Sequence, residues 1–90
     1  MAVGFWKKEA EKAIAAGYQP GNNWEAMRLR YLRANQPNLV AELEASGELL
    51  EHVQGTTWHA MRLVERLEKE GTPTQTAEEL GLAQLFPERN

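Results

Sequence analysis

A single apolar stripe runs through residues 48–70 at helical spacing. Its members are successively three, four, three, one, three and three residues apart: Leu50, Val53, Thr57, Ala60, Met61, Val64 and Leu67. Gly55 costs such a helix about 1 kcal/mol relative to alanine, but it leaves the phase of the stripe intact. We therefore expect one long helix over about 48–70, with Gly55 as the place where it would kink.

Glycine and proline divide the first half of the chain into three shorter helices. The expected ranges are about 4–16 (closed by Gly17), 24–34 and 37–45. Asn23 is expected to cap the second helix, after a loop at 17–23. Pro37 ends the second helix and begins the third, which Ser46-Gly47 then ends.

The chain beyond the long helix is expected to hold one more short helix. Thr72 and Pro73 form a helix start after Gly71, and we expect this helix to reach about Leu80 and to stop at Gly81. Residues 81–90 are then a C-terminal tail. Its apolar residues, which are expected to pack on the bundle, are Leu82, Leu85 and Phe86.

Composition favours helix throughout. Leucine, alanine, glutamate and arginine dominate, β-branched residues are sparse, and no window alternates with period two for long enough to predict a sheet. Ninety residues suit one domain with a modest core. We therefore expect an all-α fold, a small bundle of about five helices over 1–90, with its helical core at 24–80. The long helix is expected to pack against the first and second helices.

The reactive side chains argue against an enzyme. The chain has no cysteine and no aspartate, and its one serine, Ser46, stands where a helix-ending turn explains it. His52 and His59 are seven residues apart and share a helix face, but residues 55 and 56 offer no third zinc ligand. We expect no catalytic residue, no metal and no cofactor. The N-terminus lacks a secretory signal and no apolar run could span a membrane, so we expect a cytoplasmic protein without membrane contact.

Charge is distributed unevenly along the chain. Residues 1–34 carry a net charge of +3, residues 35–54 carry −4, and the whole chain carries −3. The segment MRLRYLRANQP (27–37) holds three arginines on one expected helix. Arg30 and Arg33 are expected on one side of it and Trp24, Met27 and Tyr31 on the other, while Arg28 lies at the apolar edge and packs its stem against the core.

Two kinds of binding site follow from these side chains. The first is a protein-binding site, because Trp, Tyr and Arg are enriched in binding hot spots; its residues are Arg30, Arg33, Trp24 and Tyr31. The alternative is a nucleic-acid site in the basic N-terminal half, where cations would follow phosphates; its residues are Lys7, Lys8, Lys12, Arg30 and Arg33.

Residues 24–80 contain, in this order, MRLRYL (27–32), a break before Pro37, SGEL (46–49), EHV (51–53), ERLEK (65–69) and a break at 71–72. With these features the segment resembles the TnpV family of small proteins encoded by bacterial transposons, as a shortened relative from a phage or other mobile element. The resemblance implies a helical accessory protein of a mobile element. The molecular activity of the family is undefined, so the resemblance assigns no binding residue.

We therefore expect a non-enzymatic accessory protein that docks a helical face onto a protein of the host or of the element. A nuclease or a nucleoprotein complex would suit such docking, and inhibition of a host defence nuclease is one form of it. Nucleic-acid binding by the basic half and a homo-oligomeric structural bundle remain the alternatives.

Overall fold

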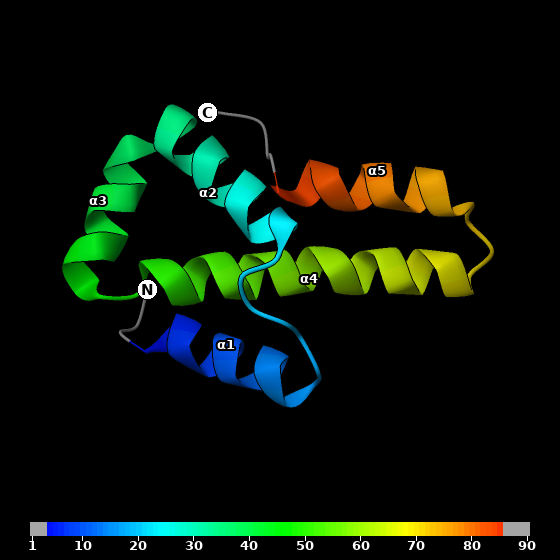
Figure 1. Ribbon diagram of the computed structural model, residues 1–90, viewed down its shortest axis with the longest axis horizontal. Coiled ribbons are helices and arrows are strands. Elements are labelled where there is room, and N and C mark those ends of the chain that lie inside the picture. Colours follow the sequence, from blue (N-terminus) through cyan, green and yellow to red (C-terminus); the bar gives the residue numbers. More distant parts are fainter. Residues whose placement is uncertain (1–3, 86–90) are drawn as a thin grey trace.

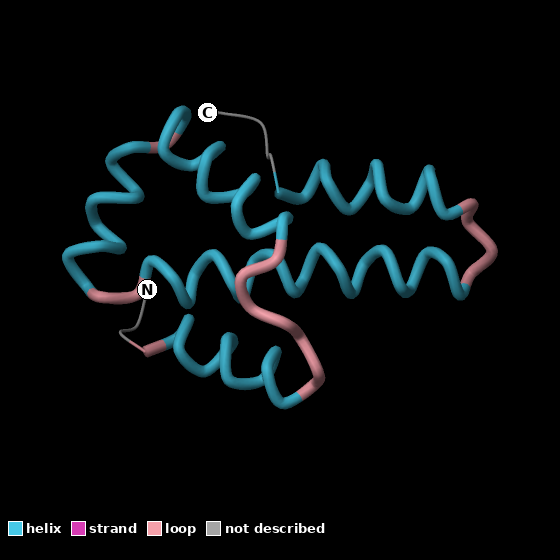
Figure 2. Tube along the Cα trace, viewed as in Figure 1, coloured by secondary structure: helices cyan, strands magenta, loops and turns pink. Residues whose placement is uncertain are grey.

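The computed structural model describes residues 4–85, and in this part of the chain it confirms a small all-α bundle. Five helices follow one another: α1 (Phe5–Ala15), α2 (Asn23–Asn35), α3 (Pro37–Ser46), α4 (Leu49–Lys69) and α5 (Thr74–Leu85). The long helix α4 contacts each of the other four (Figure 1). The segment 16–22 crosses α4, so that α1 lies on one side of it and α2 and α5 on the other (Figure 2).

α4 is one continuous helix through Gly55. An ideal Cβ built on Gly55 would lie 2.9 Å from Cε3 of Trp6 on α1, which is closer than packed atoms tolerate. Glycine therefore allows α1 to approach α4 at this position. The backbone N–H of Gly4 also donates a hydrogen bond to Oε2 of the buried Glu48 (2.5 Å), which ties the start of α1 to the start of α4.

Local signals set most helix ends, as the sequence predicts. Pro37 stands in the first turn of α3, and Gly47 ends that helix with a φ of 77°, in the left-handed region where glycine is favoured. The cap of α2 differs by one residue from the prediction. Asn22, not Asn23, caps this helix by accepting a hydrogen bond from the backbone N–H of Glu25 (3.0 Å).

The prediction that the last helix stops at Gly81 is wrong. α5 continues through Gly81 to Leu85, so a tail cannot begin at 81, and Phe86 lies outside the described residues. An ideal Cβ on Gly81 would overlap Cγ2 of Val64 and would lie 3.2 Å from Cη2 of Trp24. Gly81 thus allows α5 to pack closely on α4 and α2.

Buried apolar side chains lie at several helix contacts, including Ala10 and Ala13 on α1. Leu32, Val40 and Val53 meet where α2, α3 and α4 join, and Ala60 and Ala77 are buried where α4 meets α5. Within residues 4–85, no helix combines the length and the apolar character needed to cross a membrane.

Candidate functional site

A groove between α2 and α4 brings apolar side chains to the surface. Leu50 belongs to the predicted core stripe, yet 59% of its surface is exposed, the highest fraction among the large hydrophobic residues described. It stands at a groove of about 280 Å³, which we name the α2–α4 groove. Its lining residues are Gly21, Asn22, Glu25, Ala26, Leu29, Leu49, Leu50 and Val53. The expectation that Leu50 faces the core is therefore wrong.

Two of the predicted binding residues lie at one end of this groove. Arg30 and Arg33 are exposed on α2 and line a shallow depression that shares Ala26 and Leu29 with the α2–α4 groove. The combined surface is apolar along its floor and positively charged at its end. Such an arrangement suits a partner with an apolar ridge and nearby carboxylates.

The two predicted aromatic residues lie in different places. Tyr31 is half-buried beside the core and shares a small depression with Met27, Arg30 and Ala34. Met27 and Tyr31 therefore adjoin Arg30, and the expectation that they lie on the opposite side of α2 is wrong. Trp24 is half-buried, and its ring lies against Gly81 of α5, so this indole contributes to helix packing.

A buried hydrogen-bonded pair holds the wall of the groove. Glu25 lines the α2–α4 groove and accepts hydrogen bonds from the hydroxyl of Tyr18 and from the backbone N–H of Gly21 (3.1 Å). Burial of Tyr18, together with the neighbouring Glu25 carboxylate, raises the pKa of this phenol, which therefore stays protonated as the donor. The pair fixes the loop before α2 and thereby the edge of the groove.

Arg28 is part of the fold, as predicted. Only 6% of its surface is exposed, and burial lowers the pKa of its guanidinium. It lies near His52, which is equally buried and packs edge-on against Trp6, with ring centroids 4.5 Å apart. Burial in the first place, and the Arg28 charge in the second, lower the pKa of His52 to about 4. His52 is thus neutral near pH 7.

The predicted phosphate-binding cations do not form one continuous track. Lys7, Lys8 and Lys12 are exposed on α1, whereas Arg30 and Arg33 stand on α2, on the other side of α4 (Figure 1). Lys12 also pairs with Glu9, at 3.2 Å. A single nucleic-acid strand following all five cations would have to pass around α4.

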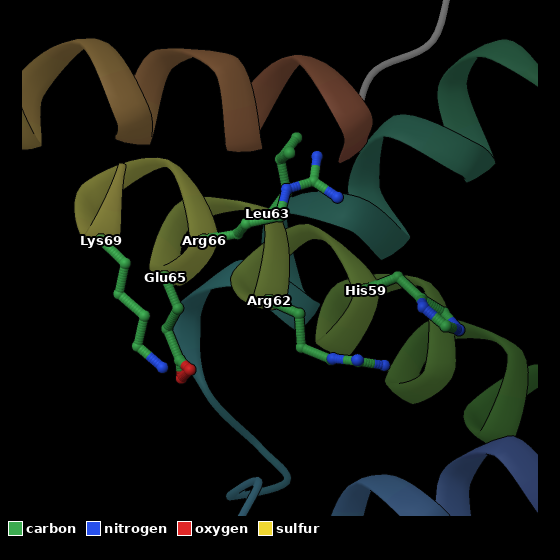
Figure 3. A pocket seen from close by; sticks show the side chains of 6 residues that line it. All are labelled: His59, Arg62, Leu63, Glu65, Arg66 and Lys69. Atoms are coloured by element: carbon green, nitrogen blue, oxygen red, sulfur yellow. The ribbon is translucent and has the colours of Figure 1, made fainter. Parts of the chain in front are cut away.

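A second group of basic side chains stands on α4 itself, and it is not among the binding residues predicted from the sequence. His59, Arg62, Arg66 and Lys69 line a surface depression together with Leu63 and Glu65 (Figure 3). The spacing of these four basic residues, three, four and three residues, was the available signal, because it places them on one helix face. No group of three or more His, Cys, Asp or Glu side chains in the described part of the chain could hold a metal ion.

The chain matches no protein-family model, no curated protein and no solved structure.

Proposed function

We propose that this chain is a non-enzymatic accessory protein that docks onto a partner protein through the α2–α4 groove. The observation that carries the proposal is the position of Leu50, which is largely exposed beside an apolar groove with two arginines at its end. An apolar groove on a surface is a common mark of a binding site, whereas single exposed apolar residues are not.

The partner we propose is an amphipathic helix with carboxylates on one flank. Helices bind grooves between other helices by inserting an apolar ridge, here against Leu29, Leu49 and Leu50. Arg30 and Arg33 stand beyond Ala26 and Leu29, where they would meet acidic residues on the flank of that helix. Leucine contacts would supply most of the affinity, and the arginines would set the orientation.

The biological setting we propose is a mobile genetic element. Its support is the resemblance of residues 24–80 to the TnpV family. The partner would then be a protein of the host or of the element, and a nuclease or a nucleoprotein complex whose action the docking blocks is the form we favour.

Affinity capture with matched variants tests this function. The tagged chain is used to retain proteins from a host that carries the element, and the retained proteins are compared with those of Leu50→Asp, Arg30→Glu/Arg33→Glu and Leu80→Asp. Leu80 on α5 is the control, because it is also an exposed leucine but lies outside the groove. We expect one partner that is retained by the wild type and by Leu80→Asp and is lost with the other two variants.

Three outcomes would contradict the proposal. The first is that the wild type retains no protein, and the second is that Leu50→Asp retains the same partner as Leu80→Asp. Light scattering provides the third: a wild-type dimer that Leu50→Asp converts to a monomer would mean that a second copy of the chain occupies the groove.

A further inference from the structure

One face of α4 is covered by α1 over its first half. Beyond α1, segment 16–22 borders this face beside Arg62 and Glu65, and the side chains of Arg62, Arg66 and Lys69 are exposed. His52 and Gly55 meet Trp6 of α1, and His59 meets Glu9. At about 100° per residue, the next cations on this face, at positions 62, 66 and 69, lie within an arc of about 80° that also contains His59. We name His59, Arg62, Arg66 and Lys69 the α4 cationic face.

α1 ends too early to cover the α4 cationic face. Its last residue is Ala15, whereas α4 continues to Lys69 (Figure 1). Arg62, Glu65 and Lys69 project away from α5, while Arg66 runs towards Leu63 (Figure 3). Among the described residues, no carboxylate lies within 4.0 Å of the cationic groups of Arg62, Arg66 or Lys69. Three permanent positive charges and the carboxylate of Glu65 therefore stand along about two turns of helix.

α1 itself shows which kind of group meets this face. Oε1 of Glu9 lies 2.9 Å from Nε2 of His59, and Oε2 of the same carboxylate lies 3.2 Å from Nζ of Lys12. The hydrogen bond with His59, and then the one with Lys12, lower the pKa of Glu9. A carboxylate carried by a helix that packs along α4 thus contacts the first member of the α4 cationic face.

We propose that the α4 cationic face binds an acidic helical segment of a partner protein, laid along α4 where α1 ends. Carboxylates three and four residues apart on such a helix have the same spacing as Arg62, Arg66 and Lys69. The face lies on the side of α4 that α1 occupies, and the α2–α4 groove lies on the side of α2. The inference therefore goes beyond the docking proposed for the groove.

Charge favours an acidic helix over a nucleic acid as the occupant. The whole chain is acidic, with a net charge of −3, and Glu65 interrupts the row of cations. A nucleic acid gains most of its affinity from many phosphate contacts, and three cations beside a carboxylate offer few. A helix that presents two or three carboxylates can pair each of them with one of these cations.

An NMR titration of the whole chain tests the inference with a defined probe. The probe is a blocked alanine-rich peptide of about 18 residues, long enough to be helical in water, with glutamates three and four residues apart. Its control is the same peptide with glutamine at those positions, and oligothymidylate provides a second polyanion. The matched protein variants are Arg62→Gln/Arg66→Gln and Lys7→Gln/Lys8→Gln, which remove the same charge from α4 and from the exposed side of α1.

In low salt we expect the glutamate peptide to shift the amide signals of residues 59–69 and the glutamine peptide to leave them in place. Binding should weaken about fivefold to tenfold in Arg62→Gln/Arg66→Gln, and it should change less than twofold in Lys7→Gln/Lys8→Gln. Arg62→Lys/Arg66→Lys should bind like the wild type, which separates lost charge from altered folding. No shifts, equal binding by both double glutamine variants, or tighter binding of oligothymidylate than of the glutamate peptide would each overturn the inference.

Discussion

His52 places a titratable ring in the contact between α1 and α4, next to the charge of Arg28. Its Nδ1 has no hydrogen-bond partner among the described residues, and the pKa of its ring is lowered to about 4. The unfolded chain, with an ordinary histidine pKa near 6.5, therefore binds more protons than the folded chain between these two values. Stability is then fully present above pH 6.5 and falls as the pH approaches 4, by up to about 3 kcal/mol from this residue.

Urea denaturation of the wild type at pH 7.5, 6 and 5 measures this loss. His52→Phe is the comparison, because phenylalanine keeps an aromatic contact with Trp6 and cannot take a proton. We expect the wild type to lose more stability than His52→Phe over this range. Equal pH dependence in the two proteins would show that His52 titrates normally.

The hydrogen bond from Tyr18 to Glu25 gives a second prediction at a single residue. In Tyr18→Phe the buried carboxylate keeps, among the described residues, only the Gly21 backbone donor, so we expect the free energy of unfolding to fall by about 1–3 kcal/mol. Thermal and urea denaturation measure the change. Tyr18→Phe/Glu25→Met removes both partners and should recover part of the loss, whereas an unchanged stability of Tyr18→Phe would mean that the hydroxyl is dispensable.

At the scale of helices, a substitution at Gly81 tests whether this glycine allows α5 to pack closely on α4. In Gly81→Ala the added methyl group would overlap Val64 and meet Trp24, so either α5 or the side chain of Val64 must move. Overpacking costs about 1–3 kcal/mol and the gain in helix propensity offsets about 1 kcal/mol of it, so we expect a net loss of up to about 2 kcal/mol. The double variant Val64→Ala/Gly81→Ala should show a much smaller effect of the Gly81 substitution, because the overlapping Cγ2 is absent. A higher melting temperature of the single variant would instead favour the sequence-based prediction that Gly81 lies outside a packed helix.

Helix positions were predictable wherever a local signal sets them. Pro37, Gly47 and the periodic stripe of α4 act through backbone geometry and residue spacing, which the sequence contains directly. Gly81 was predicted wrongly as the end of a helix. Gly55 leaves α4 continuous, as predicted, but its role in helix packing was not predicted. Both glycines have this role for a shared reason. Glycine weakens an isolated helix, but both of these glycines lie in helix interiors where a neighbouring helix packs too closely for a side chain. The tertiary fold decides which helix packs against each glycine, and the sequence around the glycine does not show it.

At the scale of the whole molecule, the sequence predicted which residues share a face but not which faces are covered. Arg30 and Arg33 were expected to be exposed, and they are. Leu50 was expected to be buried, because it belongs to the stripe of α4, but the neighbouring helices leave it exposed. The α4 cationic face was missed because its exposure depends on where α1 ends relative to α4. Both proposed binding surfaces thus arise from how short helices cover a long one.

The two surfaces should act independently, because they lie on different sides and at different ends of α4. At about 100° per residue, Leu50 and Val53 lie roughly 120–180° around the helix from His59. Once the groove partner is known, we expect Leu50→Asp to lose that partner but to bind the glutamate peptide normally, and Arg62→Gln/Arg66→Gln to do the reverse. Calorimetric titration of the wild type with one ligand should give the same affinity in the absence and in the presence of the other, since distant sites contribute additively. Competition between the two ligands would mean that one partner spans both surfaces, and the chain would then be a clamp around one protein rather than a bridge between two.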